Sequence, residues 1–229
     1  MTIIRIVKEN DMHVQTPLFI LLAGVLLGVA PGLSLSQEAA KKSDLDKRVQ
    51  EYLSKSAGTW RDMNISESDG KVLHDIIVSH RYTRALEIGT STGRSGLWIA
   101  WALSKTGGKL TTIEIDEGRH NRAVENFRKA GLIGYVDARL GDAHTIVPEL
   151  AGPFDFVFSD ADKEWYTRYL DMLLPKLTVG GCFTAHNVQS RMPGIREFLD
   201  RLAALPNMET TIEHGGGSGI SISYKTKEK

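Results

Sequence analysis

The chain has 229 residues, and its 28 Lys and Arg side chains balance 28 Asp and Glu side chains, so the formal net charge at pH 7 is zero. This length suits one α/β domain with an appendage better than two independent domains. A neutral chain has no long-range attraction for a phosphate backbone or an anionic surface, so we expect no nucleic-acid partner. The single cysteine, Cys182, lies in an apolar run, which excludes an internal disulfide and predicts a buried thiol.

Residues 1–36 have the pattern of a targeting segment. Residues 17–30 are almost entirely apolar, follow a basic stretch, and precede small residues that suit a cleavage site before Gln37. This pattern predicts a secretion signal and therefore an exported protein, periplasmic or secreted. With the residues up to 35 the run approaches the ~20 residues of a spanning helix, so an uncleaved membrane anchor through residues 17–35 is the alternative. We expect contact with a membrane only through this segment, and a cytoplasmic location is less expected.

Residues 37–46 are charged and small, and we interpret them as a tether. They lead into an amphipathic pattern that predicts a helix over Leu45–Lys55. The remaining residues, 47–229, are expected to form the folded domain.

Short apolar runs alternate with helical patterns along this domain. Strands are expected at 85–88, 109–115, 135–140, 154–159 and 181–185, and helices at 93–103, 117–130, 164–177 and 194–204. The spacing leaves room for a crossover helix between successive strands, which predicts a parallel sheet covered by helices on both faces. Residues 208–214 and 219–225 flank three glycines and are predicted to form an antiparallel hairpin at the sheet edge.

A glycine turn follows the first of these strands. Gly89 and Gly93 allow a tight turn in which a ligand can lie against backbone amides. Arg94 stands where the dinucleotide fingerprint has its third glycine, which favours a cosubstrate without a pyrophosphate. Glu114 ends the second strand, where a carboxylate can accept hydrogen bonds from both hydroxyls of an adenosine ribose. The alternative is a simple turn and a solvated carboxylate.

Six segments together resemble, in order and spacing, the catechol and caffeoyl-CoA O-methyltransferase family. They are MNISESDGKVLHDII, ALEIGTSTGRSG, TIEID, GDAHTIVPEL, FDFVFSDADKEWY and GGCFTAHNV, and the match runs from about Lys47 to Lys225. The resemblance implies an α/β fold with a Rossmann-like seven-stranded methyltransferase sheet, mostly parallel with a C-terminal antiparallel hairpin. It also implies the cosubstrate S-adenosylmethionine (SAM), methyl transfer to a hydroxyl of a small phenolic or catechol-like acceptor, and a homodimer.

The resemblance carries a set of cosubstrate-binding residues onto this chain. They are Met63, Asn64 and Ile65 at its border, Glu87, Gly89, Thr90 and Ser95 around its methionine part, Glu114 at the ribose, Asp142 and Ala143 at the adenine, and Asp162 facing it. Two of these residues also have structural interpretations. Ser95 could satisfy an amide at the start of its helix, and Asp162 could be the N-cap of the helix that follows it.

The resemblance places a divalent cation at Asp160, His186 and Asn187. His186 stands where the family has an aspartate, which weakens the case for Mg²⁺ and makes Mn²⁺, iron or zinc easier to accept; a site without metal is a further alternative. Lys163 is the candidate base, although a lysine pKa near ~10.4 would have to fall for that role. Without a metal, His186 becomes the more natural base. Lys163 as a surface lysine and His186 as a capped strand end are the structural alternatives.

Two other functions compete with a small-molecule O-methyltransferase. A catalytically degenerate SAM-binding module is suggested by His186 and by the export signal, because SAM is made in the cytosol. An RNA methyltransferase is the other alternative, against which the neutral charge argues. Arg191 stands near the expected acceptor site and suggests an anionic acceptor.

Overall fold

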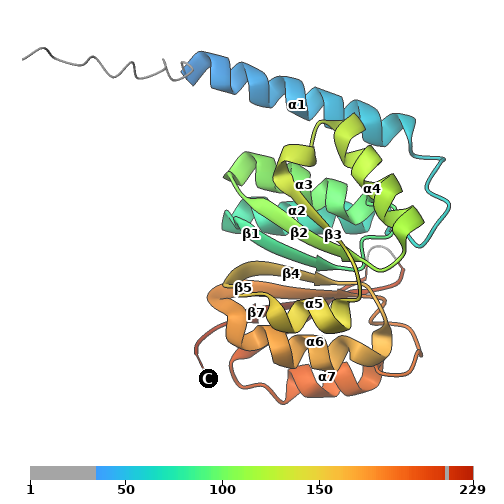
Figure 1. The fold of residues 1–229 in the computed structure, drawn as a ribbon. Helices are drawn as coiled ribbons and strands as arrows, with labels where there is room; N and C mark the ends of the chain where they lie inside the picture. The colour runs from blue at the N-terminus through green and yellow to red at the C-terminus, as the bar shows by residue number, and fades with distance from the viewer. Residues whose placement is uncertain (1–34, 215–216, 229) are drawn as a thin grey trace, which may run out of the picture.

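The computed structural model describes residues 35–214 and 217–228. Its centre is a seven-stranded sheet in the order β3-β2-β1-β4-β5-β7-β6 (Figure 1). The strands are β1 Arg84–Ile88, β2 Lys109–Glu114, β3 Val136–Leu140, β4 Phe154–Ser159, β5 Leu177–His186, β6 Met208–Glu213 and β7 Ile220–Lys225. Strands β1 to β5 pair in parallel, whereas β7 pairs antiparallel with both β5 and β6. The predicted fold class is therefore confirmed.

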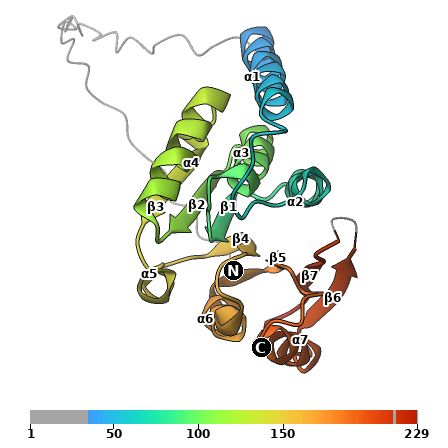
Figure 2. The same ribbon diagram turned by 90° about the vertical axis from the view of Figure 1, so that its right-hand side faces the viewer.

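Helices cover both faces of the sheet (Figure 2). One group consists of α1 Leu35–Lys55, α2 Glu67–His80, α3 Arg94–Thr106 and α4 Glu117–Ala130; the other consists of α5 Ala143–Glu149, α6 Tyr166–Leu173 and α7 Ile195–Ala203. Each group shares a buried apolar cluster with its own face of the sheet. Strands enclosed in this way need apolar side chains on both faces, which explains their nearly continuous apolar runs. Cys182 is a buried free thiol on β5, as expected.

The first helix begins ten residues earlier than the sequence pattern predicts. α1 starts at Leu35 instead of Leu45, so the predicted tether 37–46 is helical, because strong helix formers such as Ala39 and Ala40 fill it. Residues 37–44 are nevertheless exposed, so this part of α1 adds little to the core. Whether it serves as a tether, and where the domain begins, stay predictions.

Residues 1–34, which hold almost all of the predicted leader, lie outside the described residues. None of the helices in residues 35–214 and 217–228 is both long and apolar enough to cross a membrane.

The structure contains two helices that the sequence did not predict, and one predicted helix is interrupted. α2 and α5 were not predicted, and the expected helix 164–177 is a short 3-10 turn over Lys163–Trp165, then α6, then a second 3-10 turn over Leu174–Lys176. Pro175 lies in that second turn, and because proline has no N–H and clashes with the preceding helical turn, α6 ends at Leu173.

The topology brings the carboxyl ends of β1, β2, β4 and β5 to one edge of the sheet. The strand order reverses between β1 and β4, with the chain running to β2 and β3 on one side and to β5 on the other. At such a switch point the flanking crossovers run in opposite directions and leave a crevice between them. A ligand site is therefore expected beyond the ends of β1 and β4.

Candidate active site

The turn after β1 depends on glycine at position 89. Gly89 has φ +95°, and a Cβ at this position would lie 2.7 Å from the carbonyl oxygen of Asp160. The backbone N–H of Asp160 donates to the carbonyl of Ile88 at 2.8 Å, so the two strand ends are in direct contact. The absence of a side chain at Gly89 thus lets the turn after β1 lie against the residue that follows β4.

Glu114 points from the end of β2 toward this turn. Its Oε2 accepts the backbone N–H of Ser91 at 2.7 Å, and its Oε1 accepts that of Asp116 at 3.0 Å. The residue is only 6% exposed. The interpretation of Glu114 as a solvated strand end is therefore wrong, and the carboxylate is held at the mouth of the turn by two amides.

Glu87 lies fully buried beneath the same turn. Burial raises the pKa of Glu87 to about 8, although hydrogen bonds from Ser95 and Thr112 oppose that rise. Thr112 Oγ1 donates to Oε2 at 2.6 Å, whereas Oε1 has no hydrogen-bond partner in the part of the chain that the structure describes. A buried carboxyl oxygen without a partner is costly, so this atom is suited to a cationic group of a ligand.

A cavity of about 760 Å³ opens at these strand ends. Most of the predicted site residues line it: Met63, Asn64, Gly89, Glu114, Asp142, Ala143, Asp160, Asp162, Lys163, His186 and Asn187. The remaining four are buried around it and do not line it: Ile65, Glu87, Thr90 and Ser95. The structure therefore places most of the predicted residues in the lining of one cavity, and the other four are buried in the protein.

The wall near α5 is built around Asp162. Its Oδ2 lies 3.0 Å from His144 Nε2, and its Oδ1 accepts the hydroxyl of Tyr169 at 3.0 Å. The side chain makes no N-cap hydrogen bond, so that alternative for Asp162 is wrong. The His144 ring also stacks on Trp165, with ring centroids 3.5 Å apart. Asp142 caps α5 by accepting the backbone N–H of His144 at 2.9 Å.

Lys163 and His186 lie beside Asp160 in the cavity lining. Lys163 Nζ donates to Asp160 Oδ1 at 2.8 Å and to the Ala161 carbonyl at 2.9 Å. His186 is buried, with Nδ1 3.3 Å from Asp160 Oδ2 and Nε2 3.3 Å from Asp69 Oδ2. Burial opposes a charge on the ring, but the two carboxylates outweigh burial and raise the pKa of His186. Neither side chain is a surface group, so the structural alternative for Lys163 is wrong.

The three predicted cation ligands are poorly arranged for a hard divalent cation. Both oxygens of Asp160 face protein cations, and both nitrogens of His186 face carboxylates, so only Asn187 has no hydrogen bond to its side chain among the described residues. No group of three His, Cys, Asp or Glu side chains in residues 35–214 and 217–228 could hold a metal ion. Mg²⁺ and Mn²⁺ prefer several oxygen ligands. The donor set does not fit such an ion, and the cation remains only a prediction of the resemblance.

Residues 36–191 match the model of a protein family described as O-methyltransferase. This match covers more than half of the chain. The chain belongs to the O-methyltransferase family.

Curated relatives of this O-methyltransferase include two bacterial proteins named catechol O-methyltransferase. The protein from Niastella koreensis is 34% identical over 166 residues, which cover 66% of this chain and 75% of the relative. The protein from Mycobacterium tuberculosis is 32% identical over 162 residues, covering 69% and 73%. A caffeoyl-CoA O-methyltransferase from Populus kitakamiensis is 30% identical over 146 residues, covering 62% of each chain.

Solved structures similar to this O-methyltransferase include enzymes with a bound cosubstrate or its product. The O-methyltransferase from Bacillus cereus, solved in complex with SAH, has a TM-score of 0.67 and 28% identity and covers 83% of this chain and 97% of its own. TomG from Streptomyces achromogenes, solved with SAM, has a TM-score of 0.65 and 27% identity and covers 84% and 96%.

Several cavity residues of this O-methyltransferase were missed by sequence reasoning. Ser91, Ile115, Arg119, His144, Tyr169, Met192 and Ser218 line the cavity. His144 directly follows the predicted pair Asp142 and Ala143, so the same motif could have indicated it. The contact between Asp69 and His186 joins residues 117 positions apart, and no local pattern indicates it.

Proposed function

We propose that this O-methyltransferase moves the methyl group of SAM to a hydroxyl oxygen of a small phenolic or catechol-like acceptor. The observation that carries the proposal is the Glu114 carboxylate, buried at the cavity rim and bonded to the amide of Ser91 across the turn from Gly89. The relatives solved with SAH and SAM support the same cosubstrate here.

The cavity offers matching groups for each part of SAM. Each Glu114 oxygen accepts one amide and keeps capacity for a ribose hydroxyl. Ile115 is 68% exposed beside it, which supplies an apolar surface for a flat base. The unpartnered oxygen of Glu87 suits the ammonium group of the methionine part. The lining therefore offers groups for the nucleoside part of SAM, and Glu87, buried behind that lining, supports the methionine part.

Lys163 is the residue of this chain best placed to take the acceptor's proton. Two N–H bonds of its ammonium group point at the oxygens of Asp160 and Ala161, and once the third has released its proton to solvent, the lone pair left there can take the proton of the acceptor hydroxyl. As the hydroxyl proton passes to the amine, an oxygen lone pair attacks the methyl carbon, and the electrons of the breaking carbon–sulfur bond return to sulfur. Holding the two reactants in line at near-attack distance lowers the entropic part of the barrier to such a transfer.

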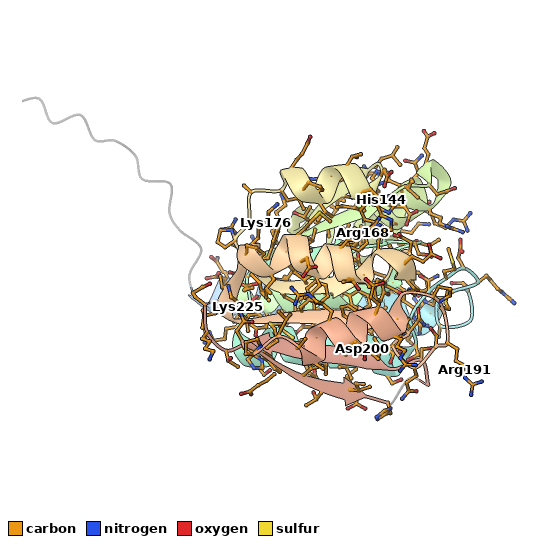
Figure 3. The ribbon with its side chains drawn as sticks, turned by 90° about the horizontal axis from the view of Figure 1, so that it is seen from below. His144, Arg168, Lys176, Arg191, Asp200 and Lys225 are labelled. Carbon is orange, nitrogen blue, oxygen red and sulfur yellow. The ribbon has the colours of Figure 1, made fainter. Side chains whose placement is uncertain are left out.

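The mouth of the cavity favours an aromatic acceptor over an anionic one. Met63 and Met192 are 68% and 53% exposed, and both line the cavity. Flexible thioether side chains pack well against aromatic rings. Arg191 is exposed, does not line the cavity and projects away from the body of the protein (Figure 3). A neutral phenolic ring therefore suits this mouth better than a carboxylate.

The test is SAM binding by calorimetry to the wild type, Glu114→Ala and Glu117→Ala, followed by methyl transfer to a panel of phenols and catechols. Losing hydrogen bonds to a charged group costs about 1.5–3 kcal/mol each, so Glu114→Ala should weaken binding by about tenfold or more. Glu117 is exposed on α4, and its variant should bind like the wild type. Wild-type protein without affinity for SAM would refute the proposal, and tight binding without transfer to any acceptor would favour a degenerate module.

A further inference from the structure

Four charged side chains of alternating sign form a continuous row behind and along the reacting wall of the cavity. We call this set the charged row; it consists of Asp69, His186, Asp160 and Lys163. Its successive contacts measure 3.3 Å, 3.3 Å and 2.8 Å. The members come from the first turn of α2, the end of β5 and the segment after β4, so the tertiary fold assembles the row.

Asp69 anchors the buried end of the row. It is 3% exposed and does not line the cavity, whereas His186 and Asp160 do. Its Oδ2 also accepts the hydroxyl of Ser66 at 2.7 Å and, as part of the capping box that begins α2, the backbone N–H of Ser66 at 3.4 Å. Asp69 is therefore fixed from behind, and the His186 ring lies between it and the cavity.

The groups of the charged row already use the nitrogen and oxygen atoms that could bind a metal ion. A histidine can bind a metal only through a nitrogen lone pair, but each ring nitrogen of His186 faces a carboxylate oxygen and is placed to donate. Both oxygens of Asp160 likewise face a cation of the protein. The two carboxylates and two basic groups of the row already balance one another in charge, so an added divalent cation would lie beside two groups of like charge.

We infer that His186 takes the place of a divalent cation in this protein. Its ring, fixed between Asp69 and Asp160, is the positive group beside the acceptor site, and the charged row excludes Mg²⁺ and Mn²⁺. The role beside the acceptor rests on the proposed function, whereas the exclusion of the cation does not.

The experiment measures Mn²⁺ binding by electron paramagnetic resonance, in which bound Mn²⁺ loses the sharp signal of the free ion. It compares the wild type with His186→Asp and His186→Asn, which differ from each other only in a carboxylate or an amide at the same place. We expect His186→Asp to bind one Mn²⁺ per chain at least about tenfold more tightly than the wild type, because the new carboxylate joins the oxygen donors of Asp160 and Asn187. His186→Asn should bind no better than the wild type.

Two outcomes would overturn the inference. One is a wild-type protein that binds one Mn²⁺ per chain as tightly as His186→Asp and loses it in Asn187→Ala. The other is a His186→Asp protein that is folded by circular dichroism and still binds no Mn²⁺. SAM affinity, measured by calorimetry on the same samples, separates failure of this inference from failure of the proposed function, because neither Mn²⁺ readout requires methyl transfer.

Discussion

Lys163 has a nearly enclosed amine whose two hydrogen-bond acceptors fix its direction. Lys163→Ala removes the proton acceptor but no proposed contact to SAM. General-base catalysis typically contributes about 10²–10⁴-fold, so we expect kcat to fall by that factor while the dissociation constant of SAM changes less than about threefold. Lys129→Ala is the control, because the Lys129 side chain forms an exposed ion pair with Glu125 on α4 and does not line the cavity. If the Lys163→Ala enzyme kept the wild-type kcat, Lys163 would not be the base.

Glu87 gives the free protein a stability that depends on pH. Burial raises its pKa from 4.5 to about 8, so between these values the native state holds a proton that the unfolded chain has lost. This contribution is therefore fully present below about pH 4.5 and is lost as pH rises through 8. Glu87→Gln stays neutral throughout. We expect the free energy of unfolding of the variant to rise relative to that of the wild type as pH increases, by on the order of a few kcal/mol at pH 9.

Urea unfolding at pH 5, 7 and 9 without SAM measures that difference. Glu51→Gln is a matched control because Glu51 is fully exposed on α1. If the difference between Glu87→Gln and the wild type is the same at all three pH values, Glu87 is ionised in the native protein at pH 5.

Some site residues could be predicted from the neighbouring sequence, and others could not. Gly89 and Glu114 could be placed because a glycine turn and an acid at a strand end are local patterns with a fixed geometric consequence. Asp69 could be recognised only as a helix cap, from its spacing with Ser66. Its contact with His186 depends on how α2 packs against the sheet, and a single sequence does not determine that packing.

Among the elements, the turn after β1 has a strict backbone requirement at Gly89. Gly89→Ala places a Cβ 2.7 Å from the Asp160 carbonyl and forces an L-residue to adopt φ +95°. We expect a loss of about 1–3 kcal/mol in unfolding free energy and at least tenfold weaker SAM binding. Gly134→Ala is the control, because its Cβ would meet nothing within 4 Å. Thermal unfolding and calorimetry measure both effects, and equal behaviour of the two variants would contradict the assigned role of Gly89.

Elements with one dominant pattern were predicted, and elements with weak or mixed patterns were not. All five parallel strands and the terminal hairpin follow from apolar runs and glycine turns. α5 is only seven residues long and contains Pro148, so no amphipathic period develops. α2 carries a capping box at Ser66, which is a start signal, but its apolar pattern is weak and no helix was predicted there. The 3-10 turn holding Lys163 could not be distinguished from the start of a helix.

At the scale of the whole molecule, the cellular location stays a prediction made from residues 17–35. We propose that this apolar segment directs export or anchors the chain in a membrane. Alkaline phosphatase is active only outside the bacterial cytosol, so a fusion to residues 1–41 should be active in a bacterial host, whereas a fusion lacking 17–35 should not. An inactive but intact first fusion would indicate a cytoplasmic protein.

The homodimer that the resemblance implies also stays a prediction.

Asp69 belongs at once to the start of α2 and to the charged row, so one carboxylate serves both a helix end and the reacting wall. A ligand that changes the charge next to His186 alters how strongly Asp69 is held by the ring, and hence how firmly the first turn of α2 is closed. Protection of the Asp69 and Gly70 amides against deuterium exchange should therefore change when SAM and acceptor enter. Deuterium exchange at the start of α2 would then report whether SAM and acceptor are bound in the cavity, although Asp69 itself does not line it.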